Sequence, residues 1–404
     1  MENNRMSRKD FLKITGTITV GTAMGLAGGH KELDAAMANA GNLPSIPRRK
    51  LGKTGVMVSV ISNGVMYNVV DKQILLKKTL DWGIAHWDTS HGYAQGNSEI
   101  GMGIYLKKHP EKRKDIFLVS KASGARTPDQ VEDCLQTSLK RLNTSYIDLF
   151  YGVHGCSSPD QLSPELRKWA EGAKKRKLIK YFGFSTHKNM PNCLMAASKL
   201  DWIDAVMTSY NFRLMQEPDM QKAVDACAKA NIGLIAMKVM GLSISSDGDK
   251  KLTDHFVKKG FSEGQAKLKA VLADTRIAAA CITMENTALI ATNAEAALDK
   301  VKLTRADMKV FREYALSTCS GYCAGCADLC DAAMPEAPVV SDIMRGLMYY
   351  NSYGNEEMAR NLYSGISPEI RNNLLALDYA KAESACPRNI PIGALIREAV
   401  EKLS

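Results

Sequence analysis

The chain has 404 residues, a formal net charge of +10 and 45% hydrophobic residues. This length exceeds one ordinary domain and fits a barrel of about 250 residues followed by a second unit. The hydrophobic content is sufficient for a folded core, which excludes a disordered chain. The basic excess suits a small anionic partner, whereas the sequence lacks the dense basic arm with interleaved aromatic residues that would predict nucleic-acid binding.

The first forty residues have the form of an export signal. Basic residues precede a mildly apolar run at Ile14–Ala27, and Ala36–Ala38 has the small-x-small form of a cleavage site. The segment resembles a twin-arginine signal in which Lys9 takes the place of the second arginine. This resemblance implies a signal peptide at residues 1–40 and a periplasmic protein. An N-terminal helix on a cytoplasmic protein is the alternative. The apolar run is too short for a membrane span.

From Ile46 onward, strand-like apolar runs alternate with helical stretches. The predicted strands are Val58–Ser62, Ala85–Asp88, Ile116–Lys121, Ile147–Val153, Ile179–Phe184, Ala205–Thr208, Gly233–Met237 and Ala278–Thr283. The predicted helices include Asp71–Trp82, Pro128–Leu142, Pro164–Arg176 and Glu217–Ala230. Eight apolar strands, each followed by a helix, predict a closed parallel α/β barrel. The absence of G-x-G-x-x-G after a strand argues against a doubly wound sheet.

Four chemically active side chains stand at three successive strand ends. Asp88 ends the second predicted strand and Tyr93 follows it, while Lys121 and His154 stand at or just after the ends of the next two. The carboxyl ends of barrel strands share one rim, where active sites lie. A phenol can protonate a carbonyl oxygen, an ammonium lowers the pKa of that phenol, a carboxylate holds the ammonium, and an imidazole orients the carbonyl. The pattern predicts a carbonyl-reducing site.

Arg49–Gly55, Trp87–Tyr93 and Gly183–Ser185 resemble, in order and spacing, the motifs of the aldo-keto reductase family. The resemblance implies a (β/α)8 TIM barrel over residues 46–302. It also implies hydride transfer between a nicotinamide cofactor and a carbonyl compound or alcohol, for example a sugar, with Tyr93 as general acid or base.

The same resemblance implies a set of cofactor contacts at the other strand ends. The residues concerned are Asn63, Gly64, Ser185, Tyr210 and Lys238. Ser185 would hold the nicotinamide carboxamide, Tyr210 would stack on the ring, and Lys238 would meet a phosphate. Asn63 and Gly64 would let the backbone approach the cofactor. Because Thr283–Asn293 contains no Lys or Arg for a 2′-phosphate, both NADP and NAD remain open.

Five of the ten cysteines lie in the last hundred residues. Cys323, Cys326 and Cys330 resemble one altered ferredoxin-type run, and Cys386, followed by proline, resembles the end of a second run. The resemblance implies one [4Fe–4S] cluster in a mainly helical domain at residues 303–404. Zinc and disulfides are the alternatives, and Cys319 is a possible substitute for Cys330.

Two other functions stay open at this point. One is an iron–sulfur redox protein that exchanges electrons with a partner protein, and the other is a ligand-binding barrel without turnover. The paired Asp88 and Lys121 favour an enzyme, because a binding protein does not need them. The substrate, the electron partner and the oligomeric state are not indicated by the sequence.

Overall fold

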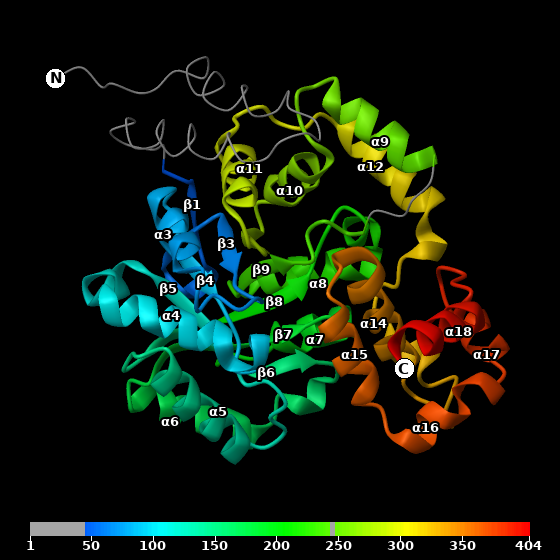
Figure 1. Ribbon diagram of the computed structural model, residues 1–404, viewed down its shortest axis with the longest axis horizontal. Coiled ribbons are helices and arrows are strands. Elements are labelled where there is room, and N and C mark those ends of the chain that lie inside the picture. Colours follow the sequence, from blue (N-terminus) through cyan, green and yellow to red (C-terminus); the bar gives the residue numbers. More distant parts are fainter. Residues whose placement is uncertain (1–44, 243–246) are drawn as a thin grey trace.

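The computed structural model describes residues 45–242 and 247–404, and the predicted signal peptide lies outside these ranges. Its centre is a closed barrel of eight parallel strands in the order β10-β3-β4-β5-β6-β7-β8-β9 (Figure 1). The strands are β3 (Ile61–Gly64), β4 (His86–Asp88), β5 (Phe117–Lys121), β6 (Ile147–Cys156), β7 (Ile179–Thr186), β8 (Ala205–Ser209), β9 (Gly233–Met237) and β10 (Ile277–Ile282). The predicted fold class is therefore confirmed.

The first predicted strand, Val58–Ser62, is wrong in detail because it joins two separate elements. β2 (Met57–Ser59) pairs antiparallel with β1 (Arg48–Lys50) in a hairpin outside the barrel. At Val60 the backbone N–H donates to Pro47 in the hairpin, while its carbonyl accepts from Ala280 of β10. The chain therefore passes from the hairpin into the barrel at this one residue, and β3 begins immediately after it.

Helices surround the barrel. The four that the sequence predicted are present, and each of their ends lies within two residues of the predicted one. The surrounding helices are α3 (Gln73–Asp81), α4 (Asn97–Lys108), α5 (Pro128–Arg141), α6 (Pro164–Lys175), α7 (Met190–Ala197), α8 (Pro218–Lys229), α9 (Asp247–Val257), α10 (Glu263–Ala273), α11 (Thr287–Leu298) and α12 (Arg305–Ser317). Pro128, Pro164 and Pro218 each occupy the first helical position, where the missing N–H costs nothing. Thr127 caps α5 by accepting from the Gln130 backbone N–H.

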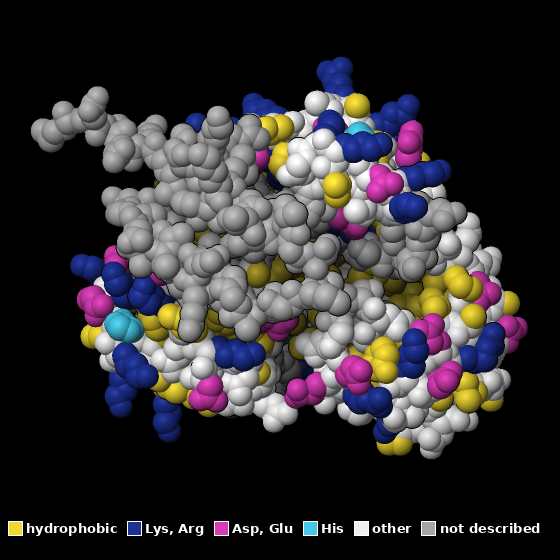
Figure 2. Space-filling model, turned by 45° about the horizontal axis from the view of Figure 1, so that its top comes forward, with side chains coloured by type: hydrophobic (Ala, Val, Ile, Leu, Met, Phe, Trp, Pro, Cys, Tyr) yellow, Lys and Arg dark blue, Asp and Glu magenta, His cyan; other side chains and the backbone are white. Residues whose placement is uncertain are grey.

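Two layers of apolar side chains hold the barrel together. One layer fills the space between strands and helices, and a smaller one fills the interior with side chains such as Val119, Leu149, Met207 and Ile235. The interior is thus a packed core, which leaves the rim as the place for a site. On the face in Figure 2, basic and acidic side chains of the described residues are interspersed.

The tail forms a group of helices beside the barrel (Figure 1). These are α13 (Ala327–Cys330), α14 (Val340–Tyr353), α15 (Glu356–Ser364), α16 (Pro368–Asn373), α17 (Ala380–Ala385) and α18 (Ile392–Leu403). They share an apolar core that begins at Cys330 and ends at Leu403. Helix α12 instead packs on α9, where Phe311 stacks on Phe256. No helix of residues 45–242 and 247–404 is long and apolar enough to cross a membrane.

Candidate active site

The four predicted catalytic residues meet at the carboxyl end of the barrel. Asp88 and Lys121 are the last residues of β4 and β5, and His154 lies near the end of β6. Tyr93 begins a short 3-10 turn after β4, in which Ala94 and Gln95 adopt left-handed backbone conformations with φ of 48° and 54°. Such conformations cost energy in non-glycine residues and concentrate at functional sites. The loop therefore holds Tyr93 in a specific position over the rim.

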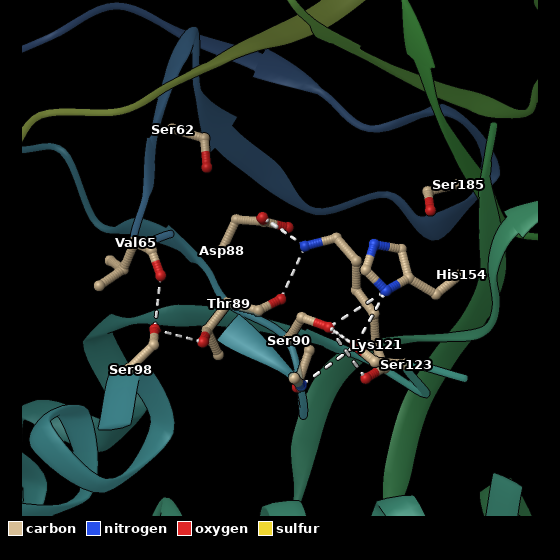
Figure 3. A network of polar contacts seen from close by, with 12 residues as sticks. Ser62, Val65, Asp88, Thr89, Ser90, Ser98, Lys121, Ser123, His154 and Ser185 are labelled. Carbon is tan, nitrogen blue, oxygen red and sulfur yellow. Dashed lines mark hydrogen bonds and ion pairs between the residues drawn. The ribbon is translucent and has the colours of Figure 1, made fainter. Parts of the chain in front are cut away.

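Asp88 and Lys121 form a buried ion pair (Figure 3). The Lys121 ammonium donates to Asp88 Oδ1 at 2.5 Å and to the Thr89 carbonyl at 2.7 Å. The two side chains are 2% and 1% exposed. Burial raises the pKa of Asp88, which the attraction of Lys121 opposes. The second oxygen, Asp88 Oδ2, is buried without a hydrogen-bond partner in the described chain. The pair fixes the ammonium beneath the rim.

Tyr93 lies directly beside this ammonium, with Lys121 Nζ 4.7 Å from the centre of its ring. Burial, followed by the nearby Asp88 carboxylate, raises the pKa of Tyr93 well above its usual value. The sequence predicted a lowered pKa for Tyr93 beside Lys121, whereas burial and the Asp88 carboxylate raise it in the protein without ligands. Tyr93 is held as a neutral phenol, the protonation state that a proton donor needs.

His154 lies on the other side of Tyr93, with the two ring centroids 5.8 Å apart. Its Nδ1 is 3.0 Å from Ser123 Oγ and 3.3 Å from Ser90 Oγ, and Ser123 Oγ accepts from the Gly92 backbone N–H (Figure 3). Burial, then Lys121, lowers the pKa of His154 to about 3. The ring is therefore neutral, and whether Nδ1 accepts from or donates to the Ser123 hydroxyl depends on which ring nitrogen carries the proton.

The predicted cofactor residues divide into two groups. Ser185 pairs with His154 across β6 and β7, and its Oγ accepts from the Gly155 backbone N–H. Asn63 is fully buried at the end of β3, and neither polar atom of its amide has a partner in the described chain. Lys238 follows β9 and lies near Met348 and Tyr349 of α14. These three remain available to a ligand at the rim.

Tyr210 and Gly64 are packed against protein groups in the structure. Tyr210 is fully buried between the barrel and its helices, and its hydroxyl donates to Asp274 at 2.6 Å. It does not line the rim, so the predicted stacking on a nicotinamide ring is wrong. At Gly64, an added Cβ would lie 3.1 Å from Cys281 Sγ and 3.3 Å from the Ile282 carbonyl oxygen. This glycine lets β3 and β10 pack closely, and its contact with a cofactor stays a prediction.

The tail adds residues to this rim that no sequence motif marks. Tyr349 on α14 is near enough to Tyr93 to act on its pKa, and Arg345 acts in the same way on His154. Gln95 donates to Glu357 of α15 at 3.0 Å. One barrel residue was also missed: Tyr151, in the interior, has a buried hydroxyl without a partner in the described residues. No local motif marks these residues, because only the tertiary fold brings them together.

The cysteines of the tail gather where the tail meets the barrel. Cys386 acts electrostatically on Cys323 and Cys326, and Cys323 and Cys326 act on Cys330. Burial raises the pKa of Cys323, and raises that of Cys326 to about 11. All ten cysteines are free thiols, so the disulfide alternative is not realised. Among the described residues, no group of His, Cys, Asp or Glu is arranged as a metal site.

Glycine 325 anchors the cysteine loop to the barrel. Its φ of +79° is left-handed, and an added Cβ would lie 2.3 Å from the carbonyl oxygen of His187. Its own carbonyl accepts from the Asn189 backbone N–H at 2.7 Å. Cys319 reaches the same region from the other side, with its Sγ 4.0 Å from the Arg388 carbonyl oxygen. Cys319 therefore lies near the turn that follows Cys386.

The barrel, its buried lysine–carboxylate pair and the adjoining tyrosine and histidine define a TIM-barrel oxidoreductase of the carbonyl-reducing class. The model of the aldo/keto reductase family matches residues 63–302, and the chain belongs to this family of NAD(P)-dependent oxidoreductases.

Individual relatives agree with this assignment. The chain is similar to aldo-keto reductase yakc of Schizosaccharomyces pombe, which carries NADP(+) in its name, with 29% identity over 56% of this chain and 68% of the relative. It is 30% identical to aldo-keto reductase str7 of Strobilurus tenacellus over 56% of this chain and 70% of that protein. In fold it resembles the Bacillus halodurans aldo-keto reductase AKR11C1, with a TM-score of 0.55, 20% identity, and coverage of 67% of this chain and 96% of that one.

Proposed function

We propose that the chain reduces a carbonyl compound with a nicotinamide cofactor, Tyr93 serving as general acid and, in the oxidation of an alcohol, as general base. The observation that carries the proposal is that the Lys121 ammonium lies 4.7 Å from the centre of the Tyr93 ring and is held by a hydrogen bond to Asp88. As the carbonyl carbon gains a hydride, the Tyr93 O–H gives its proton to the carbonyl oxygen. The product is an alcohol, and the phenolate left behind is stabilised by Lys121.

His154 orients the carbonyl in this scheme. With Nδ1 engaged by Ser123, the proton on Nε2 points away from the two serines and donates to the carbonyl oxygen. A neutral imidazole suits this role, because a hydrogen-bond donor that keeps its proton does not compete with Tyr93. The low pKa of His154, about 3, keeps the ring neutral at physiological pH.

A bound reduced nicotinamide would supply the hydride. The residues that fit such a group are Asn63, whose buried amide lacks a partner, Ser185 at the edge of the site, and Lys238 as a contact for a phosphate. Tyr210 does not fit, because its side chain turns away from the rim toward Asp274. Neither NAD nor NADP is favoured by these residues alone.

The test is turnover of a reduced nicotinamide by anaerobically purified protein with aromatic and aliphatic aldehydes. We expect aldehyde-dependent oxidation of NADH or NADPH, with alcohol formed in equal amount. A protein that binds the cofactor and aldehydes but forms no alcohol would contradict the proposal and would favour a binding role.

We further propose that Cys323, Cys326, Cys330 and Cys386 hold one [4Fe–4S] cluster, a group for one-electron transfer. The electrostatic effect of Cys386 on Cys323 and Cys326, and of these two on Cys330, supports the assignment. Metal binding needs thiolates, so a cluster would displace protons that burial now holds on the sulfurs. The cluster would link the two ends of the tail, residues 303–404, and exchange electrons with a partner protein.

Export through the twin-arginine route, which carries folded proteins, suits a chain that acquires its cluster first.

A further inference from the structure

The loop that carries Tyr93 is contacted at both of its ends by one side chain, that of Arg141, the last residue of α5. Arg141 Nη1 donates to the His91 carbonyl at 2.8 Å, two residues before Tyr93. At the other end of the loop, a Cβ added to Gly96 would lie 2.7 Å from Arg141 Cζ, so the backbone packs directly on the guanidinium. Arg141 therefore lies against the residues that enter and leave the turn.

The turn between these two contacts is strained. Ala94 and Gln95 have left-handed φ of 48° and 54°. Non-glycine residues keep such conformations only where the surrounding structure imposes them. The Gln95 side chain contacts Glu357 at an exposed position, whereas the hydrogen bond from Arg141 to His91 is partly buried. Arg141 is therefore the better shielded of these two restraints on the turn.

A buried carboxylate fixes the direction of Arg141. Glu99 on α4 is fully buried, and its Oε2 lies 3.4 Å from Arg141 Nη1. Its other oxygen, Oε1, accepts from Ser120 Oγ at 2.6 Å. Ser120 directly precedes Lys121 on β5. The pair of Arg141 and Glu99 therefore connects the loop of Tyr93 to the strand of Lys121.

The start of α4, which carries Glu99, is itself fixed to the barrel (Figure 3). Ser98 Oγ lies 2.6 Å from Thr89 Oγ1 and donates to the Val65 carbonyl at 2.5 Å. The Thr89 carbonyl accepts from the Lys121 ammonium at 2.7 Å. Glu99 therefore holds Arg141 from a position that the barrel determines.

We propose that Arg141 is a positioning residue of the active site: with Glu99, it fixes the turn so that the Tyr93 phenol stays beside the Lys121 ammonium. The inference rests on the proposed carbonyl reduction, in which Tyr93 gives its proton to the carbonyl oxygen. Displacement of a catalytic group by about 1 Å can cost about 100-fold in rate. Loss of Arg141 therefore lowers kcat more than it raises KM, because Arg141 acts on the proton donor and not on the substrate.

Kinetics of three variants test this role with aldehydes and reduced nicotinamide. Arg141→Gln should lower kcat by about 10-fold, with KM changed by less than about 2-fold. Arg141→Lys keeps the charge but lacks the planar fork, so it should recover only part of the loss. Lys140→Gln removes the same charge from an exposed neighbour on α5 and is the matched control. An equal loss of kcat in Lys140→Gln, or a loss confined to KM, overturns the proposal.

A double variant separates positioning from damage to the fold. Arg141→Gln leaves the buried Glu99 carboxylate without its cation, which destabilises the protein. Arg141→Gln combined with Glu99→Gln removes both charges and keeps an acceptor for Ser120. It should unfold closer to the wild-type temperature than Arg141→Gln does, yet keep the loss of kcat. Recovery of kcat in the double variant overturns the proposal, because the lone carboxylate would then be the cause.

Hydrogen exchange of the Tyr93 amide tests the proposal without turnover. This amide donates to the Ser90 carbonyl at 3.1 Å within the loop. We expect its exchange to accelerate by about 10-fold or more in Arg141→Gln and in the double variant, and to stay unchanged in Lys140→Gln. The Ala122 amide, which donates to the Tyr151 carbonyl at 3.0 Å, is the internal reference in the barrel. Faster exchange at Tyr93 alone supports the proposal even if no aldehyde turns over, in which case only the proposed function fails. Unchanged exchange at Tyr93 overturns it.

Discussion

The Lys121 ammonium lies 2.5 Å from Asp88 Oδ1, and both side chains are almost completely buried. A buried ion pair contributes little to stability by itself, but removal of one partner leaves an uncompensated charge that costs about 3–5 kcal/mol. The raised pKa of Asp88 reduces this cost, because the carboxyl can take up a proton. The pair is therefore better explained by the placement of a cation beside Tyr93 than by stabilisation of the barrel.

The first prediction concerns Tyr93 and Lys121. Tyr93→Phe keeps the ring and removes the proton donor, so kcat should fall by about 100-fold or more. Lys121→Met should reduce kcat and change its pH dependence, since the phenolate loses its cation. Steady-state kinetics over a range of pH measures both, and Tyr353→Phe on α14 serves as a control for loss of a phenol. Near wild-type rates in both variants would remove these residues from the mechanism.

The second prediction concerns the serine that orients His154. Ser123→Ala removes the hydroxyl 3.0 Å from Nδ1, so the ring can place its proton on either nitrogen. We expect kcat to fall by about 10-fold, and NMR of ¹⁵N-labelled histidine to show a mixture of tautomers at His154. Ser198→Ala, on the exposed end of α7, should change neither. An unaltered Nε2–H signal in Ser123→Ala would show that another group fixes the tautomer.

The barrel was predictable because its strands are local apolar runs, and because the rim follows from the order of strand ends. Asp88, Lys121 and His154 were placed correctly on that basis alone. The strand Val58–Ser62 was misread since hairpin and barrel strands have the same local pattern and differ only in their partners. The antiparallel pairing of Met57–Ser59 with Arg48–Lys50 separates them.

Side-chain direction was less predictable than position. Tyr210 does follow β8, but its backbone N–H donates to Met237 of β9, and its side chain turns outward to Asp274. Arg345 and Tyr349 were not foreseen because they reach the rim from α14, far along the chain. The raised pKa of Tyr93 was missed for a related reason: the sequence names the neighbouring cation but does not reveal the extent of burial.

The third prediction concerns acid stability. His86 is fully buried and its ring nitrogens have no partner in the described chain, and burial lowers its pKa to about 3. Below its unfolded pKa of about 6.5, the unfolded chain binds a proton that the folded barrel excludes, so stability falls as the pH falls from 6.5 toward 3. We expect His86 to contribute about 1 kcal/mol to the loss between pH 7.5 and 5.5. Denaturant unfolding of His86→Gln should show a smaller loss, whereas exposed His109→Gln should match wild type.

The fourth prediction concerns the proposed cluster. Cys386→Ser should lower the iron and sulfide content of anaerobically purified protein and should loosen the tail, because Cys386 connects its two ends. Cys319→Ser should leave iron unchanged if Cys330 is the fourth ligand. Cys227→Ala, in the barrel core, is the control. Full iron content in Cys386→Ser would refute the ligand set, and zinc in place of iron would identify the alternative metal.

The fifth prediction isolates the contact between the tail and the barrel. Gly325 and Gly354 both have left-handed φ, at +79° and +60°, but only at Gly325 does an added Cβ meet backbone, 2.3 Å from the His187 carbonyl oxygen. Each Gly→Ala change imposes the same kind of conformational cost, about 1 kcal/mol. Gly325→Ala must in addition displace the cysteine loop from the barrel, which should cost about 1–3 kcal/mol more and disturb the cavity that Gly325 and Arg345 line.

Hydrogen exchange of the Asn189 amide, which donates to the Gly325 carbonyl, should accelerate in Gly325→Ala and stay unchanged in Gly354→Ala. Equal exchange and equal stability in the two variants would show that the loop is not anchored at this glycine.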